Sequence, residues 1–288
     1  MTSKYRRPPL IQVERLTQRY QNAEPILDAV DLTVYKRDFL ALIGQNGAGK
    51  TTLVKHLNGL LRPESGRIYI DGEDIAEIST GVLAQRVGYV FQNPDHQIFL
   101  DRVDKEVGFG PNNLGLSPEE TKRRTENALS SVGLSHLADS SPHFLSKGQR
   151  QRVALASVLA MQSQILILDE PTTGQDAQEA AEIMELIVEL NKHGHTIIFI
   201  THDLQLVAKY AKRVVLMGKG KILADGPPKE VLPQTDLLRK TNLVAPQITR
   251  LAQELADERL PKDIISVEEF ADLLLRRLSP EAFLEDVI

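Results

Sequence analysis

A glycine-rich octapeptide restricts the possible folds of this chain of 288 residues more than any other segment does. Residues 44–51 read GQNGAGKT and match the phosphate-binding loop pattern in full. Residues 39–43 before the loop are typical of a short buried strand, and after it Leu53, Leu57 and Leu60 recur at helical spacing. In a strand–loop–helix unit, glycine backbone N–H groups and the helix N-terminus together bind anions. The sequence therefore predicts an α/β protein that binds the phosphates of a nucleotide.

The loop pattern assigns roles to individual side chains. Lys50 is expected to reach the β- and γ-phosphates, and the Thr51 hydroxyl is expected to hold Mg²⁺. A chance glycine-rich turn is the alternative, but the lysine and the threonine both stand in register. The other residues of this region that we expect to bind nucleotide are Gly44, Asn46, Gly47, Ala48, Gly49 and Thr52.

A second candidate site follows at residues 165–170, which read ILILDE. Four apolar residues indicate a buried strand, and two acids stand at its carboxyl end, where α/β sheets place their ligands. We expect Asp169 to bind Mg²⁺, usually through water, and Glu170 to act as the general base on the attacking water. Two acids after a strand are often just a helix N-terminus, so the phosphate-binding loop is what favours the functional interpretation.

Composition excludes several other classes of protein. Cysteine is absent, which rules out disulfides and thiolate metal sites. The formal net charge of -5 argues against a nucleic-acid binder. Residues 1–10 are basic but lack the apolar core of a secretion signal, and no run approaches the roughly 18 apolar residues that cross a bilayer. We therefore expect a cytosolic protein that reaches a membrane only through partners.

Residues 145–149 read LSKGQ and are followed by Arg150-Gln151-Arg152 and a helical pattern. This segment resembles the signature loop of the ABC (ATP-binding cassette) ATPases. The resemblance implies a dimer in which the loop contacts the γ-phosphate of ATP held by the other subunit, through a serine, glycine backbone and a helix N-terminus. The implied contacts to the partner's ATP are Ser146, Lys147, Gly148 and Gln149. Taken alone, the segment would be an ordinary helix cap.

Four further positions match functional residues of that family. Tyr20 stands where the family has an aromatic that stacks on adenine, although it could be an ordinary strand-end tyrosine. Gln92 matches the glutamine that contacts Mg²⁺ and links the core to a helical insert. Asp176 matches an acid that communicates between the two sites, and it also suits a helix cap. His202 matches the switch histidine near the γ-phosphate, which with Lys50 stabilises charge there.

One residue departs from the family pattern. The signature usually has glycine where this chain has Lys147. A lysine would be strained there if the backbone required a positive φ. With Ser146 and Gly148 intact, we expect a working or modestly weakened site, and the departure slightly favours an unlike partner subunit.

A longer segment indicates a particular branch of the family. Residues 91–99 (FQNPDHQIF) and 108–115 (GFGPNNLG) resemble the ATPases of energy-coupling factor transporters, which import vitamins and metal ions in prokaryotes. The resemblance implies a groove for helices of a transmembrane coupling subunit, a second ATPase subunit that is identical or paralogous, and a membrane substrate-binding subunit. It also implies a peripheral location at the cytoplasmic face of the cell membrane. A proline-interrupted loop without this role is the alternative.

The expected organisation follows from these patterns. We expect residues 1–235 to form an α/β ABC ATPase domain with an antiparallel β subdomain and a helical insert at about 94–161, and residues 236–288 to form a small helical extension. Amphipathic stripes in the extension are most often a face that packs against the protein's own core. The resemblance to the energy-coupling ATPases implies that the extension also holds the two subunits together. The alternatives are an ATPase of another ABC importer class, a soluble ABC ATPase in translation or DNA repair, or a regulator that does not hydrolyse ATP.

Overall fold

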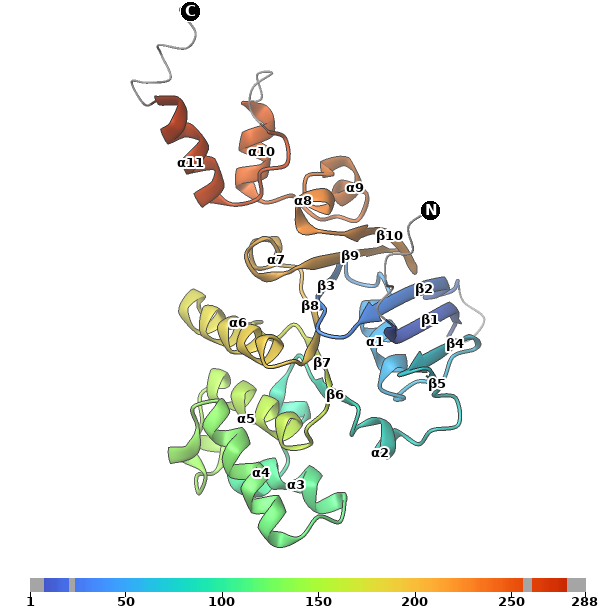
Figure 1. Cartoon of the computed structure of the whole chain (residues 1–288), viewed down its shortest axis with the longest axis vertical. Helices are drawn as coiled ribbons and strands as arrows, with labels where there is room; N and C mark the ends of the chain where they lie inside the picture. Colours follow the sequence, from blue (N-terminus) through green and yellow to red (C-terminus); the bar gives the residue numbers. More distant parts are fainter. Residues whose placement is uncertain (1–7, 21–23, 256–260, 279–288) are drawn as a thin grey trace, which may run out of the picture.

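The computed structural model describes residues 8–20, 24–255 and 261–278 of the chain. Two sheets organise these residues (Figure 1). The smaller sheet is antiparallel, with the strand order β2-β1-β4-β5. The larger sheet has the order β10-β9-β3-β8-β7-β6 and is parallel except for β10. The strands are β1 (Pro9–Gln18), β2 (Leu27–Tyr35), β3 (Phe39–Gly44), β4 (Ser65–Ile70), β5 (Glu73–Asp74), β6 (Val87–Val90), β7 (Ile165–Asp169), β8 (Thr196–Ile200), β9 (Arg213–Gly218) and β10 (Lys221–Gly226).

The central strand β3 shows how the sequence builds two cores. All six of its residues are buried, and they alternate between the faces of the sheet. Phe39, Ala41 and Ile43 pack in the core beneath the helices on one face, whereas Leu40 and Leu42 pack toward α1 (Lys50–Leu57) and the antiparallel sheet. A strand buried on both faces has a continuous apolar sequence, which is why residues 39–43 are all apolar.

Helices on the first face include a separate helical subdomain, drawn at the bottom of Figure 1. It lies between β6 and β7 in the chain, and the assignment of residues 94–161 as an insert stays a prediction. Its elements are the 3-10 helices η1 (Pro94–His96), η2 (Ser135–Leu137) and η3 (Pro142–Phe144), with α3 (Val103–Asn113), α4 (Pro118–Ser131) and α5 (Lys147–Ala160). The core helices are α2 (Thr80–Leu83), α6 (Ala177–Lys192), α7 (Leu204–Tyr210) and α8 (Pro228–Val231).

Helix α1 ends at Leu57, one turn earlier than the apolar spacing to Leu60 predicts. Gly59 adopts a φ of 73°, a left-handed conformation that ends helices. Leu60 lies beyond this turn and is exposed. The helical extent of that prediction was therefore wrong by one turn.

The last described helices are α9 (Thr235–Lys240), α10 (Gln247–Glu254) and α11 (Val267–Leu278). Leu238 of α9, together with Leu243 and Ala245 after it, belongs to the main buried cluster. Helices α10 and α11 enclose a small cluster of their own, formed by Ala252, Ile264 and Phe270. The division at residues 235 and 236 stays a prediction, and residues 279–288 of the expected extension lie outside the described residues.

Candidate nucleotide site

The phosphate-binding loop connects β3 to α1, as its pattern predicts. Two of its glycines are required by close backbone approach. A Cβ on Gly44 would lie 2.3 Å from the carbonyl oxygen of Met217 in the neighbouring strand β9. A Cβ on Gly49 would lie 2.7 Å from the carbonyl oxygen of Ile26, and its φ of +100° is in the region that favours glycine. The chain can therefore bring its backbone N–H groups around an anion only with glycine at both positions.

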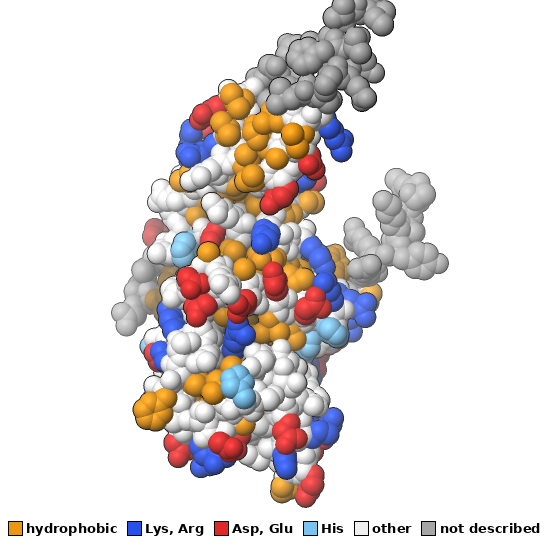
Figure 2. All heavy atoms as spheres, turned by 90° about the vertical axis from the view of Figure 1, so that its left-hand side faces the viewer, with side chains coloured by type: hydrophobic (Ala, Val, Ile, Leu, Met, Phe, Trp, Pro, Cys, Tyr) orange, Lys and Arg blue, Asp and Glu red, His pale blue; other side chains and the backbone are white. Residues whose placement is uncertain are grey.

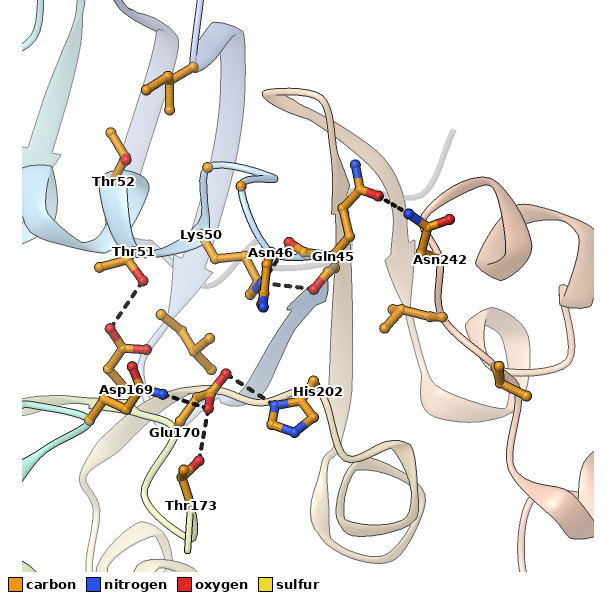
Figure 3. Close-up of a pocket in the computed structure, with 18 residues that line it drawn as sticks. Gln45, Asn46, Lys50, Thr51, Thr52, Asp169, Glu170, Thr173, His202 and Asn242 are labelled. Atoms are coloured by element: carbon orange, nitrogen blue, oxygen red, sulfur yellow. Dashed lines mark hydrogen bonds and ion pairs between the residues drawn. The ribbon is translucent and has the colours of Figure 1, made fainter. Parts of the chain in front are cut away.

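Lys50 opens α1 and is buried, with 7% of its surface exposed. Its Nζ donates to the carbonyl oxygens of Gly44, at 2.7 Å, and Gln45, at 3.0 Å (Figure 3). Burial lowers the pKa of Lys50, while Glu170 and Asp169 act in the opposite direction. The ammonium group therefore lies inside the loop, close to the acids at the ends of the neighbouring strand.

Asp169 stands at the carboxyl end of β7 and faces the loop (Figure 3). Its Oδ2 accepts hydrogen bonds from Thr51 Oγ1, at 3.1 Å, and from Tyr89 Oη, at 2.8 Å. Burial raises the pKa of Asp169, and burial beside this carboxylate raises the pKa of Tyr89. The structure thus joins Thr51 and Asp169, two of the three residues that the sequence predicted as metal ligands. The third, Gln92, lines the same cavity.

Glu170 is held by side chains from three loops (Figure 3). Its Oε2 accepts from Gln92 Nε2, at 2.9 Å, and from Thr173 Oγ1, at 2.8 Å, and its Oε1 lies 3.1 Å from His202 Nδ1. Its backbone has a φ of 47°, which is uncommon for a residue with a side chain. The predicted residues Gln92, Glu170 and His202 therefore form one constellation.

A cavity of about 1090 Å³ opens beside these groups. The predicted residues that line it are Gly44, Asn46, Gly47, Gly49, Lys50, Thr51, Thr52, Gln92, Asp169, Glu170 and His202. Ala48 is buried and is not part of the lining. Tyr20 is 45% exposed and does not line the cavity either, so its stacking on adenine stays a prediction.

Sequence reasoning missed several residues of the site. Tyr89 and Thr173 contact predicted groups, and Asn242 contacts Gln45 of the phosphate-binding loop, yet no local pattern marks these three residues. A tyrosine within the apolar strand at 87–90 was the available signal for Tyr89, because a buried hydroxyl needs a polar partner. The lining residues that were not predicted are Ile26, Gln45, Thr173, Ile200, Asn242, Leu243 and Val244.

The predicted signature residues lie outside this cavity. Ser146 caps α5, because its Oγ accepts from Gln149 N while Gln149 Oε1 accepts from Ser146 N. Ser146, Gly148 and Gln149 line a separate hollow of about 270 Å³. Asp176 caps α6 by accepting from Glu179 N at 2.8 Å. Both cap interpretations are therefore confirmed, and the roles of these residues toward a partner's ATP stay predictions.

Lys147 occupies the first turn of α5, and its backbone is not left-handed. The strain considered for a lysine at this position is therefore absent. Its Nζ lies over Gly174, only 2.3 Å from where a Cβ on that residue would be. Gly174 itself has a φ of +74°, so glycine suits this position both sterically and conformationally. The lysine side chain thus connects the signature segment to the loop before α6.

Fold and site together define a nucleotide-binding protein with a phosphate-binding loop. Residues 27–173 match the sequence profile of the ABC transporter family. The chain is 44% identical to the energy-coupling factor transporter ATP-binding protein EcfA of Methanocaldococcus jannaschii, over 90% of this chain and 92% of that protein. The chain belongs to the ABC transporter family, whose ATP-binding cassettes have this fold.

Solved structures agree with this assignment. The chain resembles cbiO1 of Clostridium perfringens, described as part of the ABC transporter complex cbiONQ, with a TM-score of 0.74, 40% identity, and coverage of 85% of this chain and 99% of that one. A dimeric ATP-binding cassette in a post-hydrolysis state with ADP and Pi matches with a TM-score of 0.69, 27% identity, and coverage of 76% and 98%. The chain spans less than half the length of two Methanosarcina relatives, covering 45% and 42% of them.

Proposed function

We propose that this chain binds and hydrolyses ATP as the ATPase subunit of an energy-coupling factor importer. The observation that carries the proposal is the fixing of Glu170 by Gln92, Thr173 and His202 beside the phosphate-binding loop. A carboxylate in this position can take a proton from water that attacks a γ-phosphate held by the loop. The likeness to EcfA and cbiO1 supports the importer class.

The residues around Asp169 suit Mg²⁺ as the cofactor. Thr51 Oγ1 and Asp169 Oδ2 lie 3.1 Å apart, and Gln92 lines the same cavity. Mg²⁺ prefers oxygen ligands and is usually held by one or two protein groups together with phosphates and water. When bound, it would neutralise charge on the β- and γ-phosphates. Lys50 would add a positive charge beside the same oxygens, and His202 would hold Glu170 in position.

The site needs a second subunit to be complete. In the described residues, Ser146 and Gly148 open on a hollow that is separate from the nucleotide cavity of their own chain. We infer that two ATPase subunits, identical or paralogous, place these residues on each other's ATP. Closing the dimer would exclude water from the reacting groups and move the helical insert through Gln92.

An apolar groove of about 300 Å³ lies between the core and the insert. Phe99 and Phe109 meet there with ring centroids 4.8 Å apart, and they are 61% and 40% exposed. Exposed aromatic side chains in a groove are suited to bind an amphipathic helix. We propose that a transmembrane coupling subunit inserts a helix here, and that a separate membrane subunit selects the micronutrient, a vitamin or transition-metal ion.

No helix among residues 8–20, 24–255 and 261–278 is long and apolar enough to cross a membrane. The likeness to EcfA and cbiO1 supports a peripheral location at the cytoplasmic face of the membrane, with the coupling subunit as the attachment. The same proposal assigns the chain no role in binding nucleic acid.

The first test is ATP hydrolysis by the native complex with Glu170→Gln. We expect the rate to fall by about 10²- to 10⁴-fold, the usual contribution of a general base, while ATP binding persists. Glu126→Gln, on the exposed side of α4, is the matched control and should leave the rate unchanged. Hydrolysis that is indifferent to Glu170 would overturn the catalytic assignment.

The importer class is tested by isolating the complex from native membranes. A second ATPase, a coupling membrane protein and a small substrate-binding membrane protein should be recovered together. Recovery of an external binding-protein importer would favour another ABC importer class. Recovery of ribosomes or DNA-repair proteins would overturn the transport assignment.

A further inference from the structure

One wall of the nucleotide cavity comes from a segment far from every predicted motif. Asn242, Leu243 and Val244 line the cavity, immediately after α9. Thr241 and Ala245 on either side are buried, whereas Val244 is 64% exposed. We call residues 241–245 the docking segment. It anchors the start of the C-terminal extension on the nucleotide site.

The docking segment is hydrogen-bonded to the phosphate-binding loop. Asn242 Nδ2 donates to Gln45 Oε1 at 2.8 Å, across 197 positions of sequence (Figure 3). The φ of Asn242 is 53°, and asparagine tolerates this left-handed conformation better than most residues. The turn therefore aims the side chain at the loop.

The base of the docking segment is fixed by the end of α9. Both the backbone N and the Oγ1 of Thr241 donate to the carbonyl oxygen of Leu238, at 2.9 and 2.8 Å, and Leu243 N donates to the same oxygen at 3.0 Å. Asn242 N donates to Arg239 O at 3.0 Å. Thr241 also packs against β9, since a Cβ on Gly218 would lie 3.0 Å from its Cγ2. The backbone on both sides of Asn242 is thus fixed by hydrogen bonds and packing.

Gln45 is hydrogen-bonded both to Asn242 of the docking segment and to Lys50 of the phosphate-binding loop. The Gln45 carbonyl oxygen accepts from Lys50 Nζ at 3.0 Å and from Ala48 N at 3.1 Å, while its side chain accepts from Asn242. Phosphates that bind Lys50 compete for the ammonium group that now bonds this carbonyl. Gln45 therefore lies between the lysine that would bind phosphate and the docking segment, and it is hydrogen-bonded to both.

We propose that Asn242 is a positioning residue for the phosphate-binding loop, and that ATP binding and the docking of residues 241–245 stabilise each other. Two such events are reciprocal, because each changes the free energy of the other by the same amount. The inference rests on the proposed function only in taking ATP as the ligand. It assigns regulation of the nucleotide site to the start of the extension.

The test compares ATP affinity, by isothermal titration calorimetry in Mg²⁺, across a double-mutant cycle. Asn242→Gly removes the amide but suits the observed φ, and Gln45→Ala removes the acceptor. Each single variant should weaken ATP binding by about 3- to 10-fold, the range of one net hydrogen bond. The double variant should be no weaker than the weaker single variant, because both remove the same bond.

Gln162→Gly is the matched control, since Gln162 is exposed and has a φ of 59° away from the cavity. It should leave ATP affinity unchanged. Amide hydrogen exchange gives the second readout: ATP should slow exchange in residues 241–255 of the parent and not of Asn242→Gly.

Three results would each overturn the proposal. They are a wild-type ATP affinity in Asn242→Gly, additive effects in the double-mutant cycle, and a rate of amide hydrogen exchange in residues 241–255 of the parent that ATP does not change. A parent that fails to bind ATP would instead contradict the proposed function. If Asn242 had only a structural role, Asn242→Gly would be less stable than the parent in the absence of ATP, and the two substitutions would have additive effects on ATP affinity.

Discussion

The nucleotide site concentrates ionisable groups in places where burial opposes their charge. Burial lowers the pKa of Lys50 and raises the pKa of Asp169, so each charged form is disfavoured by the fold that holds it. Thr51 and Tyr89 donate to Asp169 and offset part of that penalty. At Lys50 and Asp169, the charge that the proposed function needs therefore lowers the stability of the fold.

Asp169→Asn should make that conflict measurable. The pKa of the folded state lies above that of the unfolded state, so Asp169 lowers stability as pH rises through the folded value. Near neutral pH the variant should therefore have a higher free energy of unfolding than the parent, by urea denaturation without nucleotide. The difference should vanish at acid pH, where Asp169 is protonated in both states. ATP hydrolysis should be lost.

Asp101→Asn is the control for a carboxylate at an exposed position, with 78% of its side chain exposed. It should leave the free energy of unfolding at neutral pH close to that of the parent. A lower stability of Asp169→Asn at neutral pH would contradict the argument.

Local pattern predicted the residues of the site that stand next to one another in sequence. Lys50 with Thr51, and Asp169 with Glu170, follow buried strands in recognisable order. Tyr89 reaches Asp169 only because β6 pairs in parallel with β7, with Tyr89 opposite Ile167. No periodicity in a single sequence specifies such a register, so this contact could not be predicted.

At the scale of elements, strands and helices are fitted to each other with little free space. Helix α5 lies against β6 so closely that a Cβ on Gly88 would be 2.1 Å from Val158 Cγ1. Apolar periodicity predicted both α5 and β6. It did not predict the order of the strands in the larger sheet, where β3 lies between β8 and β9. The strand order depends on contacts between residues far apart in the chain, and the buried strands have similar apolar sequences.

Gly88→Ala should destabilise the protein by about 1–3 kcal/mol, the usual effect of overpacking a filled core. Val158 and Leu166 are the neighbours that would have to shift. Gly81→Ala is the matched control, because nothing lies within 4 Å of a Cβ there. Chemical denaturation should show the control as neutral or slightly more stable, and equal losses in both variants would contradict the packing argument.

At the scale of the whole molecule, the end of the described chain is attached in two different ways. Leu238, Leu243 and Ala245 pack in the main core, whereas α10 and α11 have their own cluster. Figure 2 shows hydrophobic side chains gathered over the upper end of the molecule, where these two helices lie. The exposed apolar residues there are Leu251, Leu255, Val267 and Leu275. The amphipathic pattern of the extension was predictable, but the firm attachment of its first residues was not.

A chain that ends at Ala245 should fold and bind ATP, because of the described residues that form the main core it loses only Ile265. Its dimer should be weaker, since the exposed apolar faces of α10 and α11 are removed. Analytical ultracentrifugation with ATP, in the Glu170→Gln background, measures this. A chain that ends at Pro233 is the contrasting variant and should unfold more easily, because it loses Leu238 and Leu243. An unchanged dimer after the cut at Ala245 would contradict a role for α10 and α11.

The left-handed backbone of Glu170 has a consequence for how this chain could change over generations. Residues other than glycine incur roughly 1–2 kcal/mol in that conformation. Glycine at 170 would relieve the strain and asparagine would reduce it, yet both would remove the carboxylate. On the proposed role of Glu170, selection for stability alone would therefore favour a form that binds nucleotide without hydrolysing it. On the same proposal, selection for ATP hydrolysis is what keeps a strained glutamate at this position.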